Sequence, residues 1–273
     1  MRASDALAAL AVFVGAALQG APAAAQAPPP QRCVLAADGG IYSGGWGPIR
    51  VQVLTATTRL DCPLSGDLSG GLDWAIVYHA VNGDVPPTLV PGNPYPHLTW
   101  SRAFGAWRPS VRVGLVPSAS GTYNEFGDTG RKRALAANGD LEQWLYLPAT
   151  HWLVLQTGVG LDGPFLFQLD GALAGHTHRL DANGLTGQFT LALGARVYGR
   201  VELGARLGLS ADLLGYALPS LARVEFSAAP FARLRFDRWR VEANLLVNLG
   251  PAVPPGFQEK AFWSTHLVVG ADL

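Results

Sequence analysis

Charged side chains recur at alternate positions in the C-terminal part of the chain, on faces that otherwise carry small or polar residues. Residues two apart in a β-strand project to the same side. The charged residues concerned are Glu202, Arg206, Arg223, Glu225, Arg233, Arg235, Arg240 and Glu242. If these residues line the inside of a closed sheet, the pattern predicts one of two arrangements. One is a charged constriction that selects ions, and the other is an interior network of neutralised ion pairs. A closed sheet of about eight to ten strands has little free lumen, which favours the network.

A second group, His176 and His178 with Asp181, has the residue types of a metal site or of a catalytic histidine. Two imidazoles on one strand face can converge on a cation. Two ligands are few, however, and the segment is polar, so we interpret it as a solvated loop. We expect no metal site and no cofactor.

Hydrolytic chemistry would need a serine and a histidine within hydrogen-bond reach, together with a third, orienting group. The chain contains no Gly-x-Ser-x-Gly motif, and the candidate hydroxyls of Ser210, Ser227 and Ser264 can each be ordinary interior groups. We therefore predict no catalytic residues. A serine hydroxyl near His176, His178 or His266 at the outer leaflet would favour the opposite interpretation.

The elements that must position these residues are antiparallel strands. From residue 150 to the C-terminus, apolar and polar residues alternate in segments of about 10 to 13 residues, separated by turn residues, as in transmembrane strands. The connections are short near 163, 199 and 237 and longer near 180, 216 and 255. Short turns on one side of a membrane and long loops on the other are typical of a transmembrane barrel.

Upstream strands over 72–81, 98–106, 110–116 and 143–161 bring the predicted number to ten, beginning near residue 71. The fold class is therefore all-β, an antiparallel up-and-down transmembrane barrel over 71–273, with eight or twelve strands as alternatives. The count becomes twelve if 48–59 and a partner strand join the barrel. Otherwise residues 26–70 form a periplasmic or plug-like extension.

The N-terminus predicts export. Arg2 precedes an apolar run from Ala6 to Leu18 and a small-residue stretch, which is the order of a secretory signal peptide over 1–25. Cys33 and Cys62 then lie in an oxidising compartment, where a disulfide between them is expected.

Composition fits a chain that faces an apolar medium. Charged residues make up only 15% of the chain, against about 25% in soluble domains. The net charge is zero and the arginines are scattered, which argues against nucleic-acid binding. No segment is apolar enough for a membrane helix.

With these residues in view, the chain resembles the bacterial outer-membrane β-barrels of Gram-negative cells over 71–273. The resemblance rests on the signal peptide, the hairpin spacing and a last strand with apolar residues at every second position back from Leu273. It implies the cell outer membrane as location, and lipid, lipopolysaccharide and the barrel assembly machinery as partners. We expect a non-enzymatic narrow passive channel or a structural barrel. The alternatives are a lipid or lipopolysaccharide hydrolase and a soluble periplasmic β-domain.

Overall fold

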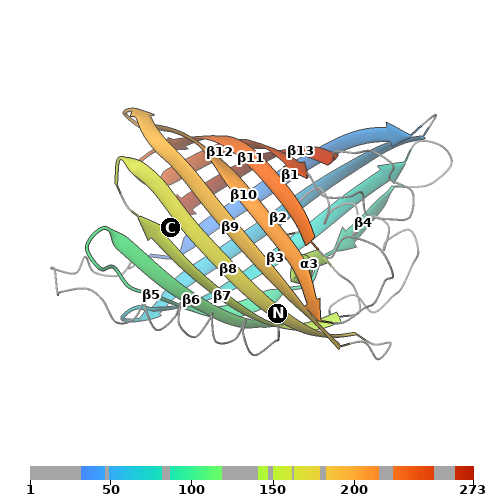
Figure 1. Ribbon diagram of the computed structural model, residues 1–273, viewed down its shortest axis with the longest axis horizontal. Coiled ribbons are helices and arrows are strands. Elements are labelled where there is room, and N and C mark those ends of the chain that lie inside the picture. Colours follow the sequence, from blue (N-terminus) through green and yellow to red (C-terminus); the bar gives the residue numbers. More distant parts are fainter. Residues whose placement is uncertain are drawn as a thin grey trace.

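The computed structural model is a closed antiparallel β-barrel (Figure 1). It describes residues 32–46, 49–81, 87–118, 141–146, 150–161, 163–178, 183–214, 224–248 and 262–273. The predicted signal peptide and the segment containing Arg223 therefore lie outside the described residues.

Neighbouring strands in the chain are neighbours in the wall, and the first strand closes on the last. The strands are β1 (Val34–Trp46), β2 (Ile49–Ser65), β3 (Leu68–Val81), β4 (Thr88–Pro91), β5 (Tyr95–Ser101), β6 (Trp107–Val116), β7 (Thr150–Leu161), β8 (Phe165–His178), β9 (Asn183–Tyr198), β10 (Val201–Leu214), β11 (Val224–Arg235), β12 (Trp239–Asn248) and β13 (Phe262–Asp272). β4 and β5 lie one after the other along β3, so the wall has twelve strand positions.

The twelve-strand alternative holds, and the leading expectation of ten strands is wrong. Residues 34–65 are the two additional strands: β1 pairs with β13 on one side and with β2 on the other. The barrel therefore begins at Val34, not near residue 71. The expected disulfide is confirmed between Cys33 and Cys62, whose Cα atoms are 4.1 Å apart at the open end of the β1–β2 hairpin.

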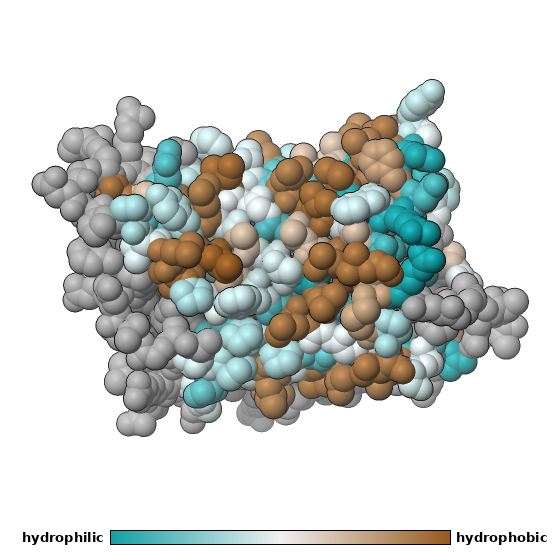
Figure 2. Space-filling model, turned by 180° about the vertical axis from the view of Figure 1, so that it is seen from behind, coloured by the Kyte–Doolittle hydropathy of each residue, from teal (hydrophilic) through white to brown (hydrophobic). Residues whose placement is uncertain are grey.

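The two faces of the wall differ in chemistry, as the alternation predicted. Side chains that point outward are large and apolar and remain exposed, including Leu115, Leu153, Leu207 and Leu267, which are each more than half exposed. On the face shown in Figure 2, apolar side chains lie over much of the wall between the two ends, and hydrophilic residues gather toward one end. An apolar outer wall without a covering layer is what a lipid-facing barrel requires.

The region expected as one long strand over 143–161 divides into two elements. Gln143–Tyr146 form a single helical turn, α3, and β7 begins only at Thr150. No helix among the described residues is long and apolar enough to cross a membrane. Trp144, Leu145 and Tyr146 are almost fully buried against side chains of the inner wall.

A break in the wall receives this helical turn. Between β4 and β5, the Asn93 backbone N–H donates to the Leu145 carbonyl at 2.9 Å, and the Asn93 side-chain amide donates to the Trp144 carbonyl at 3.0 Å. Gly92 is required here, because a Cβ would lie 2.5 Å from the Leu145 carbonyl oxygen. Asn93 thus satisfies carbonyls that a one-turn helix cannot satisfy itself.

The aromatic residues near the strand ends follow two different patterns. Phe165, Tyr198, Phe236 and Trp239 beside the short turns are exposed. Trp144, Tyr146 and Trp152 are buried inside the barrel. With Tyr42, Tyr95 and apolar residues of β2, β3, β7 and β8 they form a core that fills one side of the lumen near the long-loop end.

Candidate functional site in the barrel lumen

Five of the eight charged residues predicted to line the lumen, Glu202, Arg206, Arg233, Arg235 and Glu242, form one connected network. Glu202 accepts contacts from Arg196, Arg233 and Arg235 at 3.4, 3.5 and 3.1 Å. Glu242 contacts Arg206 at 3.1 Å and Arg233 at 2.7 Å. Both glutamates are buried, with 4% and 5% of their surface exposed. Arg233 thus links two carboxylates, and the strand register explains this, because Arg233 lies directly opposite Glu202 on one side and Glu242 on the other.

Two other predicted residues lie near this network, and one of its members was not predicted. Arg240 faces the same lumen and lines two cavities there. Glu225 lies on β11 and is half-buried. Arg196 was not singled out, yet its ion pair with Glu202 follows from the register of β9 against β10.

A second polar network on β2, β3, β5 and β6 was missed entirely. Arg112 contacts Asp61 at 3.3 Å and Asp73 at 3.5 Å. His97 lies 3.2 Å from Asp73, and Thr99 accepts a hydrogen bond from Arg112 Nε at 3.0 Å. The signal was hidden because Asp61 was assigned to an extension rather than to the wall.

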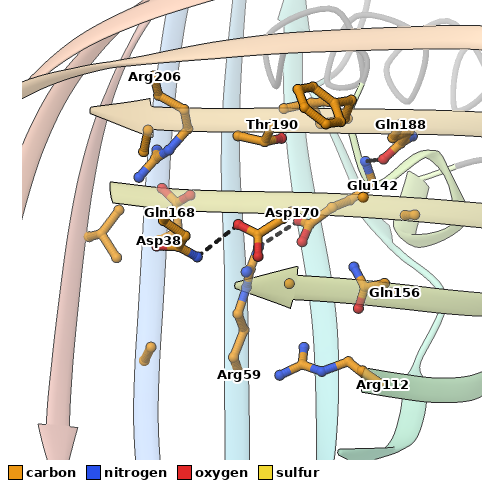
Figure 3. A pocket seen from close by; sticks show the side chains of 18 of the residues that line it. Asp38, Arg59, Arg112, Glu142, Gln156, Gln168, Asp170, Gln188, Thr190 and Arg206 are labelled. Carbon is orange, nitrogen blue, oxygen red and sulfur yellow. Dashed lines mark hydrogen bonds and ion pairs between the residues drawn. The ribbon is translucent and has the colours of Figure 1, made fainter. Parts of the chain in front are cut away.

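A third contact crosses the lumen. Glu142, which precedes α3, pairs its carboxylate with Arg59 of β2 at 2.5 Å, and its backbone N–H donates to Gln188 Oε1 of β9 at 2.8 Å. In the ring of twelve strands β2 and β9 stand six positions apart, on opposite walls. Figure 3 shows Glu142 between these two side chains. Residues 141–146 are therefore attached to both sides of the barrel.

The backbone of Glu142 shows that this placement is enforced by its surroundings. Its φ is 54°, a left-handed conformation that costs a non-glycine residue about 1 kcal/mol.

Tyr146, two residues beyond Trp144, shares a hydrogen bond of 3.1 Å with the hydroxyl of Thr57. Burial raises the pKa of the Tyr146 phenol well above its ordinary value. The phenol therefore stays neutral within the apolar core.

Polar cavities lined by described residues lie in the lumen. One of about 460 Å³ lies beside Glu142, between Arg59, Arg112, Gln168 and Arg206 (Figure 3). Another, of about 510 Å³, lies toward the short turns beside Arg235 and Arg240. Both are lined by Ser110, Gln168, Asp170, Arg233 and Arg240. Because they share these residues, polar space extends from the short-turn end to the level of Glu142.

A serine, a histidine and an aspartate are also linked by two successive hydrogen bonds. Ser264 Oγ lies 2.9 Å from His266 Nε2, and His266 Nδ1 lies 3.1 Å from Asp38 Oδ1. This is the order of contacts in a nucleophilic triad. The serine is close to the start of β13, on the long-loop side, but its surface is fully buried. Asp38 was missed because it lies 228 positions from His266.

The histidine pair predicted near residue 177 does not form a metal centre in the described part of the chain. The His176 ring packs against Trp152, with ring centroids 4.4 Å apart. The side chain of His178, and Asp181 as a whole, lie outside the described residues. No group of three or more potential metal ligands occurs among the residues described.

Comparisons with known proteins agree on the fold. No protein-family model matches the chain, and no curated protein matches it. An outer membrane channel from Pseudomonas putida F1 is similar with a TM-score of 0.63 and 12% identity, over 93% of this chain and 100% of that chain. The NanC porin is similar with a TM-score of 0.54 and 7% identity, over 88% of this chain and 100% of that chain. The fold, together with the apolar outer wall, is that of an integral outer-membrane β-barrel.

Proposed function

We propose that the protein is a narrow passive channel for small polar solutes. The observation that carries the proposal is the polar space inside an apolar-walled barrel: two cavities with shared lining residues lead from the short-turn end to Glu142. A purely structural barrel would have no need of this space, and charged residues that line a lumen act on the solutes within it. The similar folds of a channel and a porin are consistent with the proposal.

Planar-bilayer recording tests this function. The purified barrel should give discrete current steps, and a large side chain in the lumen should reduce them. Thr190 lines the cavity beside Glu142, so Thr190→Trp is expected to lower the conductance about twofold.

Leu193→Trp is the matched control, since Leu193 lies on the same strand and is 49% exposed on the outer wall. Its conductance should equal that of the unchanged protein. A folded barrel that never gives discrete steps would rule out the channel.

The Ser264–His266–Asp38 arrangement favours a second candidate function, ester hydrolysis at the long-loop side. His266 would accept the proton of the Ser264 hydroxyl, and Asp38 would orient the ring. The burial of Ser264 opposes this function, because a substrate carbonyl can reach the hydroxyl only if its surroundings move apart.

A fluorophosphonate probe distinguishes the two roles of Ser264. A hydrolase should be labelled in the detergent-solubilised barrel, and Ser264→Ala should abolish labelling. Ser227→Ala is the control, because Ser227 is another buried serine of the inner wall. Absence of labelling, with unchanged folding, would assign the three residues to a structural hydrogen-bond network.

A further inference from the structure

The short-turn end of the lumen carries an excess of positive charge. Among the described residues, five arginines and three aspartates line the 510 Å³ cavity. One of these aspartates, Asp237, is largely exposed and already contacts Arg200 at 3.4 Å, outside the cavity lining. The side chains that remain therefore present mainly guanidinium groups to the cavity.

The neighbouring glutamates do not neutralise this charge. Glu202 and Glu242 are both engaged within the network, and four arginines share these two carboxylates. Within the part of the chain that the structure describes, Arg240 forms no ion pair. Its guanidinium is therefore available to a solute.

The position of Arg240 is unfavourable without a partner. It lies directly opposite Arg235 in the β11–β12 ladder, and like charges at such positions destabilise a sheet. Gly270 of β13 makes room for it, because a Cβ there would lie 2.5 Å from Arg240 Nε. The fold thus places two arginines side by side at the cavity, and Gly270 accommodates the side chain of Arg240.

We infer that Arg235 and Arg240 form a binding site for small oxyanions, which carry carboxylate or phosphate groups, at the short-turn mouth of the lumen. An oxyanion would accept hydrogen bonds from both guanidinium groups and remove their mutual repulsion. The site deepens the proposed channel function by naming the solute class, and it rests on that function for its role in transport. Positively charged walls raise the local concentration of anions in a narrow lumen.

Direct binding tests the site separately from conduction. Calorimetric titration of the detergent-solubilised barrel, with inorganic phosphate and with succinate in separate arms at low salt, should detect both ligands. Arg240→Gln should weaken binding about tenfold through the loss of charge-assisted hydrogen bonds. Arg240→Lys keeps the charge without the planar fork and should give an intermediate affinity.

Arg32→Gln is the matched control, because it removes the same charge at the same end of the barrel from an exposed residue that lines neither cavity. It should bind both anions like the unchanged protein. Heat-modifiable gel mobility verifies that each variant is folded. Binding of phosphate alone or of succinate alone identifies which of the two chemistries the site accepts.

Equal affinities of the Arg240→Gln variant and the unchanged protein, or no binding in either arm, would overturn the inference. Reversal potentials in a salt gradient separate it from the channel proposal. Anion binding without current steps would retain the site and reject the channel. Current steps whose anion preference is the same in Arg240→Gln and in the unchanged protein would retain the channel and reject the role of the site in selectivity.

Discussion

Replacing Glu142 with alanine is expected to raise single-channel conductance about twofold, because it removes a side chain that crosses the lumen. Glu142 joins opposite walls through Arg59 and Gln188, and it borders the polar cavity of about 460 Å³. Truncation removes the side chain that crosses the lumen and leaves the Arg59 guanidinium without its carboxylate. Planar-bilayer recording measures the result.

A double-mutant cycle isolates the ion pair from the loss of volume. Arg59→Met should produce a similar increase in conductance, and the combination with Glu142→Ala should add little, because both substitutions remove the same contact. Glu142→Gln, which keeps the shape of the side chain, should have a smaller effect. Additive increases in the double variant would show that Arg59 and Glu142 act independently.

The largest effect on stability is expected at Glu242. Glu242→Ala should lower the free energy of unfolding by roughly 3 kcal/mol, because removal of one member leaves buried charge uncompensated. Arg206 and Arg233 both contact this carboxylate, and Asn244 donates a further hydrogen bond to it at 3.3 Å. Urea unfolding of the barrel in lipid vesicles, followed by tryptophan fluorescence, measures the change.

Asp237→Ala provides the comparison, since Asp237 forms an exposed ion pair with Arg200 in a short turn. Exposed pairs contribute little, so its unfolding free energy should change by less than about 0.5 kcal/mol. Equal effects of the two substitutions would mean that the interior network stabilises the barrel no more than a surface pair does.

The outer wall was predictable from sequence because every outward position faces lipid and therefore favours an apolar side chain. In the strands β8 to β13, strict alternation separates exposed apolar residues from interior polar ones, which is why charged residues could be predicted to face the lumen. β1 lacked that signal because its sequence, VLAADGGIYSGGW, contains four glycines and offers few large apolar side chains to alternate. The cysteine pair carried the missing information: a bridge between residues 33 and 62 places the midpoint of a hairpin near Gly47 and Pro48.

The interior of the barrel was less predictable, since it depends on contacts between distant strands. Trp144 and Tyr146 have aromatic side chains suited equally to a membrane interface and to a buried core. Only the docking of their backbone at Asn93 decides between these locations. The same applies to Asp38 and His266, whose proximity depends on closure of the first strand against the last.

That closure has a consequence for how the protein is made. The two edges that meet at β1 and β13 come from opposite ends of the chain, and the backbone N–H of Leu273 donates to the Cys33 carbonyl at 2.8 Å. Pairing of such distant segments is slow, because the entropy of closing the intervening chain is lost before the contacts are gained. The Cys33–Cys62 bridge can hold the β1–β2 hairpin together while the rest of the chain inserts. The β1–β2 hairpin, which is synthesised first, would then already be formed when β13, which is synthesised last, pairs with β1 and closes the barrel.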